Sequence, residues 1–159
     1  MSTSFELDSV DRFVVGTVGE PGNRTFFFQV VAPGVLLSFK CEKVQVAALT
    51  DALKVMMTDL PPATPSPTIW ANLDTPVLAE WVVGSIGIGY EGSADRVVLL
   101  LEELREDPDD GSQARFFLTR DQIATFIDKT PEVVSGGRPT CVLCSVPIDS
   151  DGFNCPCYN

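Results

Sequence analysis

The hydrophobic pattern of this 159-residue chain changes its period repeatedly, and the order of those changes restricts the folds open to it. Short runs rich in β-branched and aromatic residues predict strands at residues 13–18, 25–31, 35–40, 80–90, 96–104 and 113–118. A helix is expected after the third strand and another after the sixth. Because strands and helices do not alternate one by one, we expect an α+β fold. Its sheet should be mainly antiparallel and built from two β-β-β-α units.

The first predicted helix covers about residues 42–59 and should place an apolar stripe on the sheet. Pro61 and Pro62 should end this helix, because proline lacks the backbone N–H that a helix needs. A Pro- and Thr-rich loop follows at 61–76, and Trp70 should anchor it to the body of the protein. The expected stripe, interrupted only by Asp51, consists of Val44, Ala47, Ala48, Ala52, Val55 and Met56.

The second predicted helix begins with a capping box. Thr119 supplies the N-cap hydroxyl, and Gln122 stands three residues later, where its side chain can bond back to the N-cap backbone. We expect Ile123, Phe126 and Ile127 to share one apolar face. Pro131 should bend or break the helix, and the glycine pair at 136–137 should stop it.

Charge and composition exclude several classes of function. The net charge is −11, with ten acidic and two basic residues in the segment 61–112, so a sequence-independent nucleic-acid binder is not expected. The chain has no histidine, which excludes histidine-dependent catalysis and His-ligated metal sites. It contains no apolar run long enough to span a membrane. Since the N-terminus lacks the features of a secretory signal, we expect a cytoplasmic protein.

Four of the five cysteines fall in the last nineteen residues, in the order C-x2-C, ten residues, C-x-C. Such clustering in a reducing compartment favours metal binding over a disulfide framework. A closed set of four thiolates suits structural zinc, which would replace the core that so short a tail lacks. Free thiols at an abandoned site and a redox or transfer role are the alternatives. The expected ligands are Cys141, Cys144, Cys155 and Cys157, which divides the chain into an α+β domain (1–137) and a zinc knuckle (138–159).

Several segments together resemble an uncharacterised, mostly actinobacterial family, a domain of unknown function. They are residues 11–19 (DRFVVGTVG), 24–27 (RTFF), 42–49 (EKVQVAAL), 81–84 (WVVG) and 137–144 (GRPTCVLC). The resemblance implies a Cys3His site in relatives. In this chain Phe153 stands where that family has His, Ser145 where it has Gly, and Cys157 where it has Arg. The fourth ligand would therefore be Cys157.

Two arginines near the N-terminus suggest an anion site. Gly16, Gly19 and Gly22, followed by Arg24, could form a small backbone nest for a phosphate or carboxylate, with Arg12 contributing charge. Ordinary turns and surface ion pairs are the alternative. A second pattern, the G-x-G-x-x-G at 87–92, is followed by a strand and not a helix, so it is interpreted as a hairpin and not as a dinucleotide site.

Two functions remain open at this point. The favoured one is a non-catalytic binding or adaptor module with a structural zinc knuckle and a protein partner. The alternative is an enzyme, or an enzyme subunit, that acts on a phosphorylated or otherwise anionic small molecule near Arg12 and Arg24. A deep pocket lined by both arginines would favour the enzyme, and a flat apolar patch would favour the adaptor.

Overall fold

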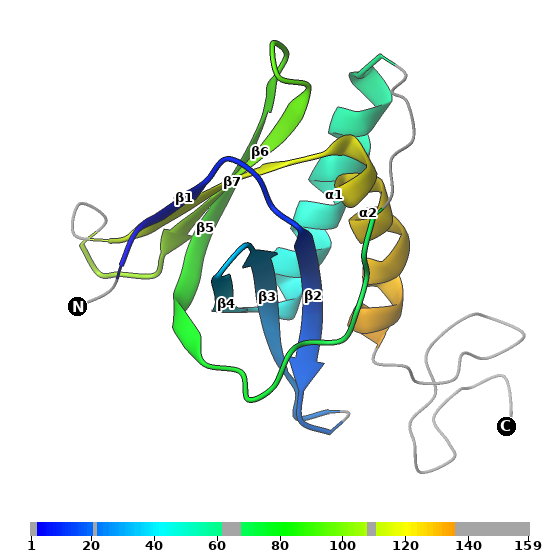
Figure 1. Cartoon of the computed structure of the whole chain (residues 1–159). Coiled ribbons are helices and arrows are strands. Elements are labelled where there is room, and N and C mark those ends of the chain that lie inside the picture. Colours follow the sequence, from blue (N-terminus) through cyan, green and yellow to red (C-terminus); the bar gives the residue numbers. More distant parts are fainter. Residues whose placement is uncertain (1–2, 21, 62–67, 108–110, 136–159) are drawn as a thin grey trace, which may run out of the picture.

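The computed structural model describes residues 3–20, 22–61, 68–107 and 111–135, which form one seven-stranded sheet and two helices (Figure 1). Across the sheet the strands run in the order β1-β7-β6-β5-β4-β3-β2. The elements are β1 (Phe5–Leu7), β2 (Arg12–Val18), β3 (Thr25–Ala32), β4 (Val35–Cys41), α1 (Lys43–Asp59), β5 (Ala79–Glu91), β6 (Arg96–Glu103), β7 (Gln113–Leu118) and α2 (Arg120–Ser135).

The sheet is mixed, which corrects the expectation of a mainly antiparallel one. Each predicted three-strand unit is an antiparallel meander, β2-β3-β4 and β5-β6-β7. The two units join through a parallel pairing of β4 with β5, and β1 adds a second parallel pairing, with β7. The prediction failed here because a helix and a long segment separate β4 from β5. That connection brings the chain back to the end of the sheet at which β4 begins, so β5 runs in the same direction as β4.

Both helices lie together on one side of the sheet, but α1 presents a different face from the predicted one (Figure 1). Its buried apolar residues are Val46, Leu49 and Leu53, which are 0–4% exposed. Two members of the predicted stripe, Val44 and Val55, are 71% and 67% exposed. Leucines bury more apolar area than the alanines that make up half of the predicted stripe, so the leucine face packs on the core.

The core contains an aromatic cluster that joins both units. Phe126 of α2 stacks on Phe13 of β2 with ring centroids 5.0 Å apart, and it lies 6.4 Å from Phe28 of β3. In the middle of the sheet, Phe39 of β4 packs against Trp81 of β5, with ring centroids 4.6 Å apart. A helix from the second unit therefore completes the interior of the first unit.

Residues 68–78, which we name the crossing segment, pass from the helix side of the first unit to its other face. Trp70 lies on the helix side, 6.2 Å from the ring of Phe126, as its predicted anchoring role requires. Farther along, the backbone N–H of Asp74 donates to Gln29 Oε1 at 2.7 Å, and Gln29 Nε2 donates to the Asp74 carbonyl at 3.2 Å. The segment thus passes around β2 on its way to β5, and it buries Gln29 completely.

The start of α2 is the predicted capping box. Thr119 Oγ1 accepts from the backbone N–H of Gln122 at 3.1 Å, and Gln122 Oε1 accepts from the N–H of Thr119 at 2.8 Å. The helix continues through Pro131 to Ser135, so the proline does not break it.

The predicted domain boundary near residue 137 lies outside the described residues. None of the described helices is long and apolar enough to cross a membrane.

A polar cluster ties the tip of the β5–β6 hairpin to the first residue of α2. Arg120 Nε donates to Asp95 Oδ1 at 2.7 Å, and the Tyr90 hydroxyl donates to the same carboxylate oxygen. The Tyr90 hydrogen bond, and next the Arg120 hydrogen bond, lower the pKa of Asp95 below its ordinary value of 3.8. Asp95 has a backbone φ of +51°, a left-handed conformation that Asp tolerates better than most residues.

Candidate functional site

The structure does not bring Arg12 and Arg24 together. Arg12 begins β2, opposite Val31 of β3, whereas Arg24 precedes β3 at the other end of the same hairpin. Six residues of extended strand separate these two ends, which corresponds to about 20 Å. Arg12 is engaged in an ion pair, with its Nη2 2.8 Å from Oδ2 of Asp74 in the crossing segment.

Arg24 is held against the C-terminal end of α2. Its Nη1 donates to the Val133 carbonyl at 3.0 Å, and its Nη2 donates to the Val134 carbonyl at 3.1 Å. The last carbonyls of a helix have no partner within the helix and carry partial negative charge, so a guanidinium satisfies them well. The last turn of α2 contains no basic residue of its own. The Arg24 guanidinium also lies 5.2 Å from the Phe26 ring centroid, so its position is well defined.

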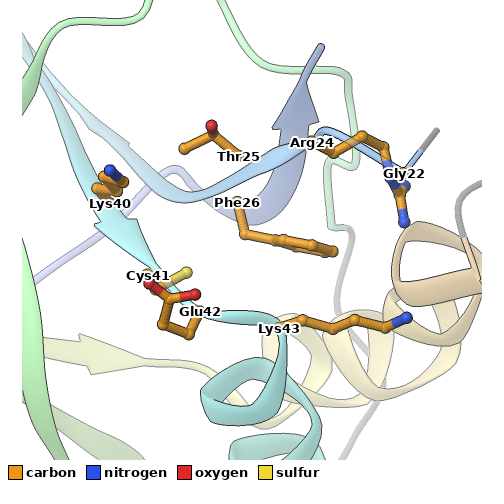
Figure 2. A pocket seen from close by; sticks show the side chains of 8 residues that line it. All are labelled: Gly22, Arg24, Thr25, Phe26, Lys40, Cys41, Glu42 and Lys43. Atoms are coloured by element: carbon orange, nitrogen blue, oxygen red, sulfur yellow. The ribbon is translucent and has the colours of Figure 1, made fainter. Parts of the chain in front are cut away.

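A hollow of about 390 Å³ opens beside Arg24, and we name it the cationic hollow. It lies where the end of β4 meets the start of α1, across from the start of β3 (Figure 2). Figure 2 shows the Lys43 side chain extending toward the Arg24 side, while Glu42 turns back beside Cys41. The hollow is lined by Gly22, Arg24, Thr25, Phe26, Lys40, Cys41, Glu42 and Lys43.

The charge of this hollow is opposite to that of the chain as a whole. Arg24, Lys40 and Lys43 outnumber the single acidic residue, Glu42, in a protein of net charge −11. Neither lysine forms an ion pair with any residue in the described part of the chain. The start of α1 adds the positive end of a helix dipole. Together these groups produce a local positive potential that suits an anion.

The Cys41 thiol at the edge of the hollow is not a reactive group. Cys41 is 2% exposed, as expected for a small buried apolar residue. Burial raises the pKa of its thiol to about 12. A thiol with so high a pKa stays protonated at neutral pH, and the thiolate is the form that acts as nucleophile or metal ligand.

A second hollow, of about 410 Å³, lies on the other side of Arg24. Its walls come from the end of β2, from the crossing segment at Trp70–Leu73, and from Glu132 and Val133 in the last turn of α2. Arg24 therefore borders both hollows.

The predicted metal site lies elsewhere in the chain. Its four ligands, Cys141, Cys144, Cys155 and Cys157, fall outside the described residues. Within the described ranges, no three His, Cys, Asp or Glu side chains are grouped so that they could hold a metal ion.

Residues 5–155 of the chain match the model of a protein family. The chain belongs to the DUF3090 family. This is a family of proteins of unknown function, so membership confirms the resemblance to a domain of unknown function and assigns no activity. No curated protein and no solved structure gives a match to this chain.

The limits of the DUF3090 match bear on the predicted zinc ligands. The matched region includes Cys141, Cys144 and Cys155 but ends before Cys157. The cysteine that the sequence analysis expected to replace a family histidine is therefore the one beyond the matched region. Three expected ligands belong to the part of the chain that the family shares.

Sequence reasoning identified Arg24 but missed Lys40 and Lys43. The signal was present, because both lysines flank the point where a predicted strand passes into a predicted helix. Such a junction places them near the positive end of the helix, where an anion would be favoured. What the sequence could not show was that the β2–β3 turn brings Arg24 to the same place.

Proposed function

We propose that this DUF3090 protein is a non-catalytic binding module that holds a small anionic ligand in the cationic hollow. The observation that carries the proposal is the grouping of Arg24, Lys40 and Lys43 around one opening of an otherwise acidic protein. A phosphate or carboxylate there would gain charge-assisted hydrogen bonds from the two lysines. It would also gain the potential of a guanidinium already fixed by the end of α2.

Binding without chemistry fits the groups around the hollow. The chain has no histidine, and the thiol of Cys41 is kept protonated by burial. An enzyme acting near both arginines receives less support, because Arg12 and Arg24 lie at opposite ends of the β2–β3 hairpin and each has its own intramolecular partners.

Thermal unfolding in the presence of inorganic phosphate tests this function. A ligand that binds only the folded state at ten times its Kd stabilises it by about 1.4 kcal/mol, which raises Tm by about 3–6 °C for a chain of this size. Sodium chloride at matched ionic strength controls for general screening of the net charge. We expect phosphate, but not chloride, to raise Tm of the wild-type protein.

Two variants make the test specific. The double variant Lys40→Ala/Lys43→Ala should lose the phosphate effect, because it removes the two flexible cations. Lys54 lies on α1, as Lys43 does, but outside the hollow, so Lys54→Ala should keep the phosphate effect. Equal phosphate responses in all three proteins would contradict binding at the hollow.

We also propose, from the sequence, that Cys141, Cys144, Cys155 and Cys157 bind one structural zinc ion. Four thiolates make a closed tetrahedral site with no position left for a catalytic water, so the ion would stabilise the tail and not act on a substrate. Metal analysis of protein purified under reducing conditions should find about one zinc per chain. Cys144→Ser should lower that content and leave the unfolding of the α+β domain unchanged. Metal-free protein with four titratable thiols in the tail would contradict the proposal.

A further inference from the structure

The solvent-facing side of α1 is apolar, although α1 already buries a different apolar face. Val44, Ala48, Ala52 and Val55 follow one another at spacings of four, four and three residues, so they form one stripe along the helix. All four are exposed, and the two valines are 71% and 67% exposed. We name these four residues the α1 outer stripe.

A helix at the surface of a globular protein normally has one apolar face and one polar face. In α1 the buried face is formed by Val46, Leu49 and Leu53, which leaves the outer stripe without an intramolecular partner in the described part of the chain. Single exposed apolar residues are common, but a continuous apolar stripe on a strongly charged protein is typical of an interaction surface.

The stripe continues into a groove of about 320 Å³ between α1 and β5. Ala48 and Ala52 belong to both, and their small side chains leave the groove open on the helix side. Ile86 and Ile88 form the sheet side, and each is partly exposed. Gly84 also lines the groove, at the point where the β5–β6 register shifts. Gln45 is the polar residue of the lining, and its amide donates to the Val83 and Gly84 carbonyls, so the surface is a mainly apolar groove as well as a stripe.

Carboxylates border the stripe, and the lysines of α1 lie away from it. Asp51 is three residues after Ala48 and four before Val55, and Asp59 is four residues after Val55, so both neighbour the stripe on the helix surface. Asp51 and Lys54 both line a small hollow against α2, together with Thr130 and Pro131, and Lys54 lies three residues beyond Asp51, farther around the helix from the stripe. Asp59 also stands at the negative end of the helix dipole, and the last turn of α1 contains no basic residue.

We propose that the α1 outer stripe and the adjoining groove bind an amphipathic helix of a partner protein whose apolar face is bordered by Lys or Arg. An amphipathic helix presents apolar residues at the spacing that a groove of this kind accepts. Basic residues beside its apolar face would meet Asp51 and Asp59. A second copy of this chain fits less well, since the same carboxylates would face each other and each copy carries a net charge of −11.

The probe for this surface is a synthetic 18-residue Leu/Lys peptide designed as an amphipathic helix, with a Leu/Glu peptide of the same pattern for comparison. We expect saturable binding of one Leu/Lys peptide per chain by isothermal titration calorimetry, and at least tenfold weaker binding of the Leu/Glu peptide. Hydrogen exchange should slow in α1 and in β5 around Ile86 and Ile88 when the Leu/Lys peptide is bound.

Substitutions on the stripe separate specific docking from general attraction to an acidic protein. Ala52→Glu places a charge in the groove at an exposed helical position, so we expect the fold to be kept and peptide affinity to fall at least tenfold. Val18→Glu adds the same charge at a 44% exposed valine on β2 and should leave affinity within twofold. Asp59→Asn removes one bordering carboxylate and should weaken binding about threefold.

Three outcomes would overturn the proposal. Equal effects of Ala52→Glu and Val18→Glu would mean that the peptide binds by overall charge alone. Equal affinity for the two peptides would remove the requirement for basic residues. A dimer seen by analytical ultracentrifugation and abolished by Ala52→Glu would assign the surface to a second copy of the chain.

Discussion

The two three-stranded units of the sheet have the same succession of elements, but only the first has both of its faces covered by residues that the structure describes. On the outer face of the first unit, Val14 and Gln29 are completely buried and Ser38 is 3% exposed. On the same face of the second unit, Gly87 and Ser85 of β5 are exposed. The crossing segment makes this difference, because its Leu73 and Asp74 lie against Gly16 and Gln29 on the outer face of the first unit. The connection between two similar units has thus given them different surfaces.

The polar contacts of the first unit follow from this covering. Gln29 Nε2 donates to Ser38 Oγ and to the Asp74 carbonyl, so its amide links two strands to the crossing segment. A buried amide is costly without partners and acceptable with them. If the outer face of the first unit were exposed, as that of the second unit is, the Gln29 side chain would lie in solvent.

The largest expected effect comes from a residue that links the units. Phe126 is fully buried among Phe13, Phe28 and Trp70, so Phe126→Ala leaves a cavity between α2, the first unit and the crossing segment. We expect the free energy of unfolding to fall by about 3–5 kcal/mol. Urea denaturation followed by fluorescence and by circular dichroism measures it. Separate transitions for the two units, with only one of them destabilised, would show that the units are not joined as the structure indicates.

A matched pair of glycines gives the next largest effect. A Cβ at Gly16, in the covered unit, would lie 2.5 Å from Leu73 Cγ, whereas a Cβ at Gly89 in the second unit would meet nothing within 4 Å. We expect Gly16→Ala to cost about 1–3 kcal/mol by displacing the crossing segment. Gly89→Ala should be neutral or slightly stabilising, because Ala loses less backbone entropy than Gly in a strand.

Thermal and urea unfolding of both glycine variants measure this difference. Leu73→Ala introduced into Gly16→Ala should recover part of the loss, because it removes the atoms that the new methyl group would touch. A cost at Gly89 equal to that at Gly16 would contradict the contrast between a covered and an open face.

The smallest effect concerns pH and the hairpin of the second unit. Since the Tyr90 and Arg120 hydrogen bonds lower the pKa of Asp95, ionised Asp95 stabilises the folded state above its ordinary pKa of 3.8. This contribution is lost as pH falls below about 4, through the lower pKa of the folded state. Asp95→Asn keeps a residue that tolerates positive φ but removes the titration.

Urea denaturation at pH 7, 4 and 3 compares the two proteins. The stability of the wild-type protein should fall more steeply below about pH 4 than that of Asp95→Asn, because only the wild type loses the Asp95 contribution. Parallel pH profiles would show that the carboxylate of Asp95 is not stabilised in the folded state.

The sequence was most informative about local structure. The period of the hydrophobic pattern located six of the seven strands and both of the helices that the structure describes, and the Thr119–Gln122 capping box is present as predicted. It missed β1, a three-residue strand too short to show a period, and the parallel β4–β5 pairing, which depends on the path of a distant segment. It also chose the wrong face of α1, since both faces have helical spacing and only burial distinguishes them.

The candidate site was predictable only in part, for the same reason. Arg24 was identified from its neighbouring glycines, of which Gly19 and Gly22 have positive φ as a turn requires. Its grouping with Lys40 and Lys43, and its separation from Arg12, depend on strand direction and register across β2, β3 and β4. Residues far apart in sequence meet there through pairing that no local pattern encodes.

The packing of Phe126 against β2 and β3 has a consequence for synthesis on the ribosome. The N-terminal strands emerge first, but the aromatic ring that fills their interior belongs to the last helix, and β1 pairs with β7 from the same late region. The early strands of the nascent chain therefore stay only partly buried until α2 has been translated. A fragment ending after α1 should be bound by chaperones or aggregate, and neither half of this domain should fold alone.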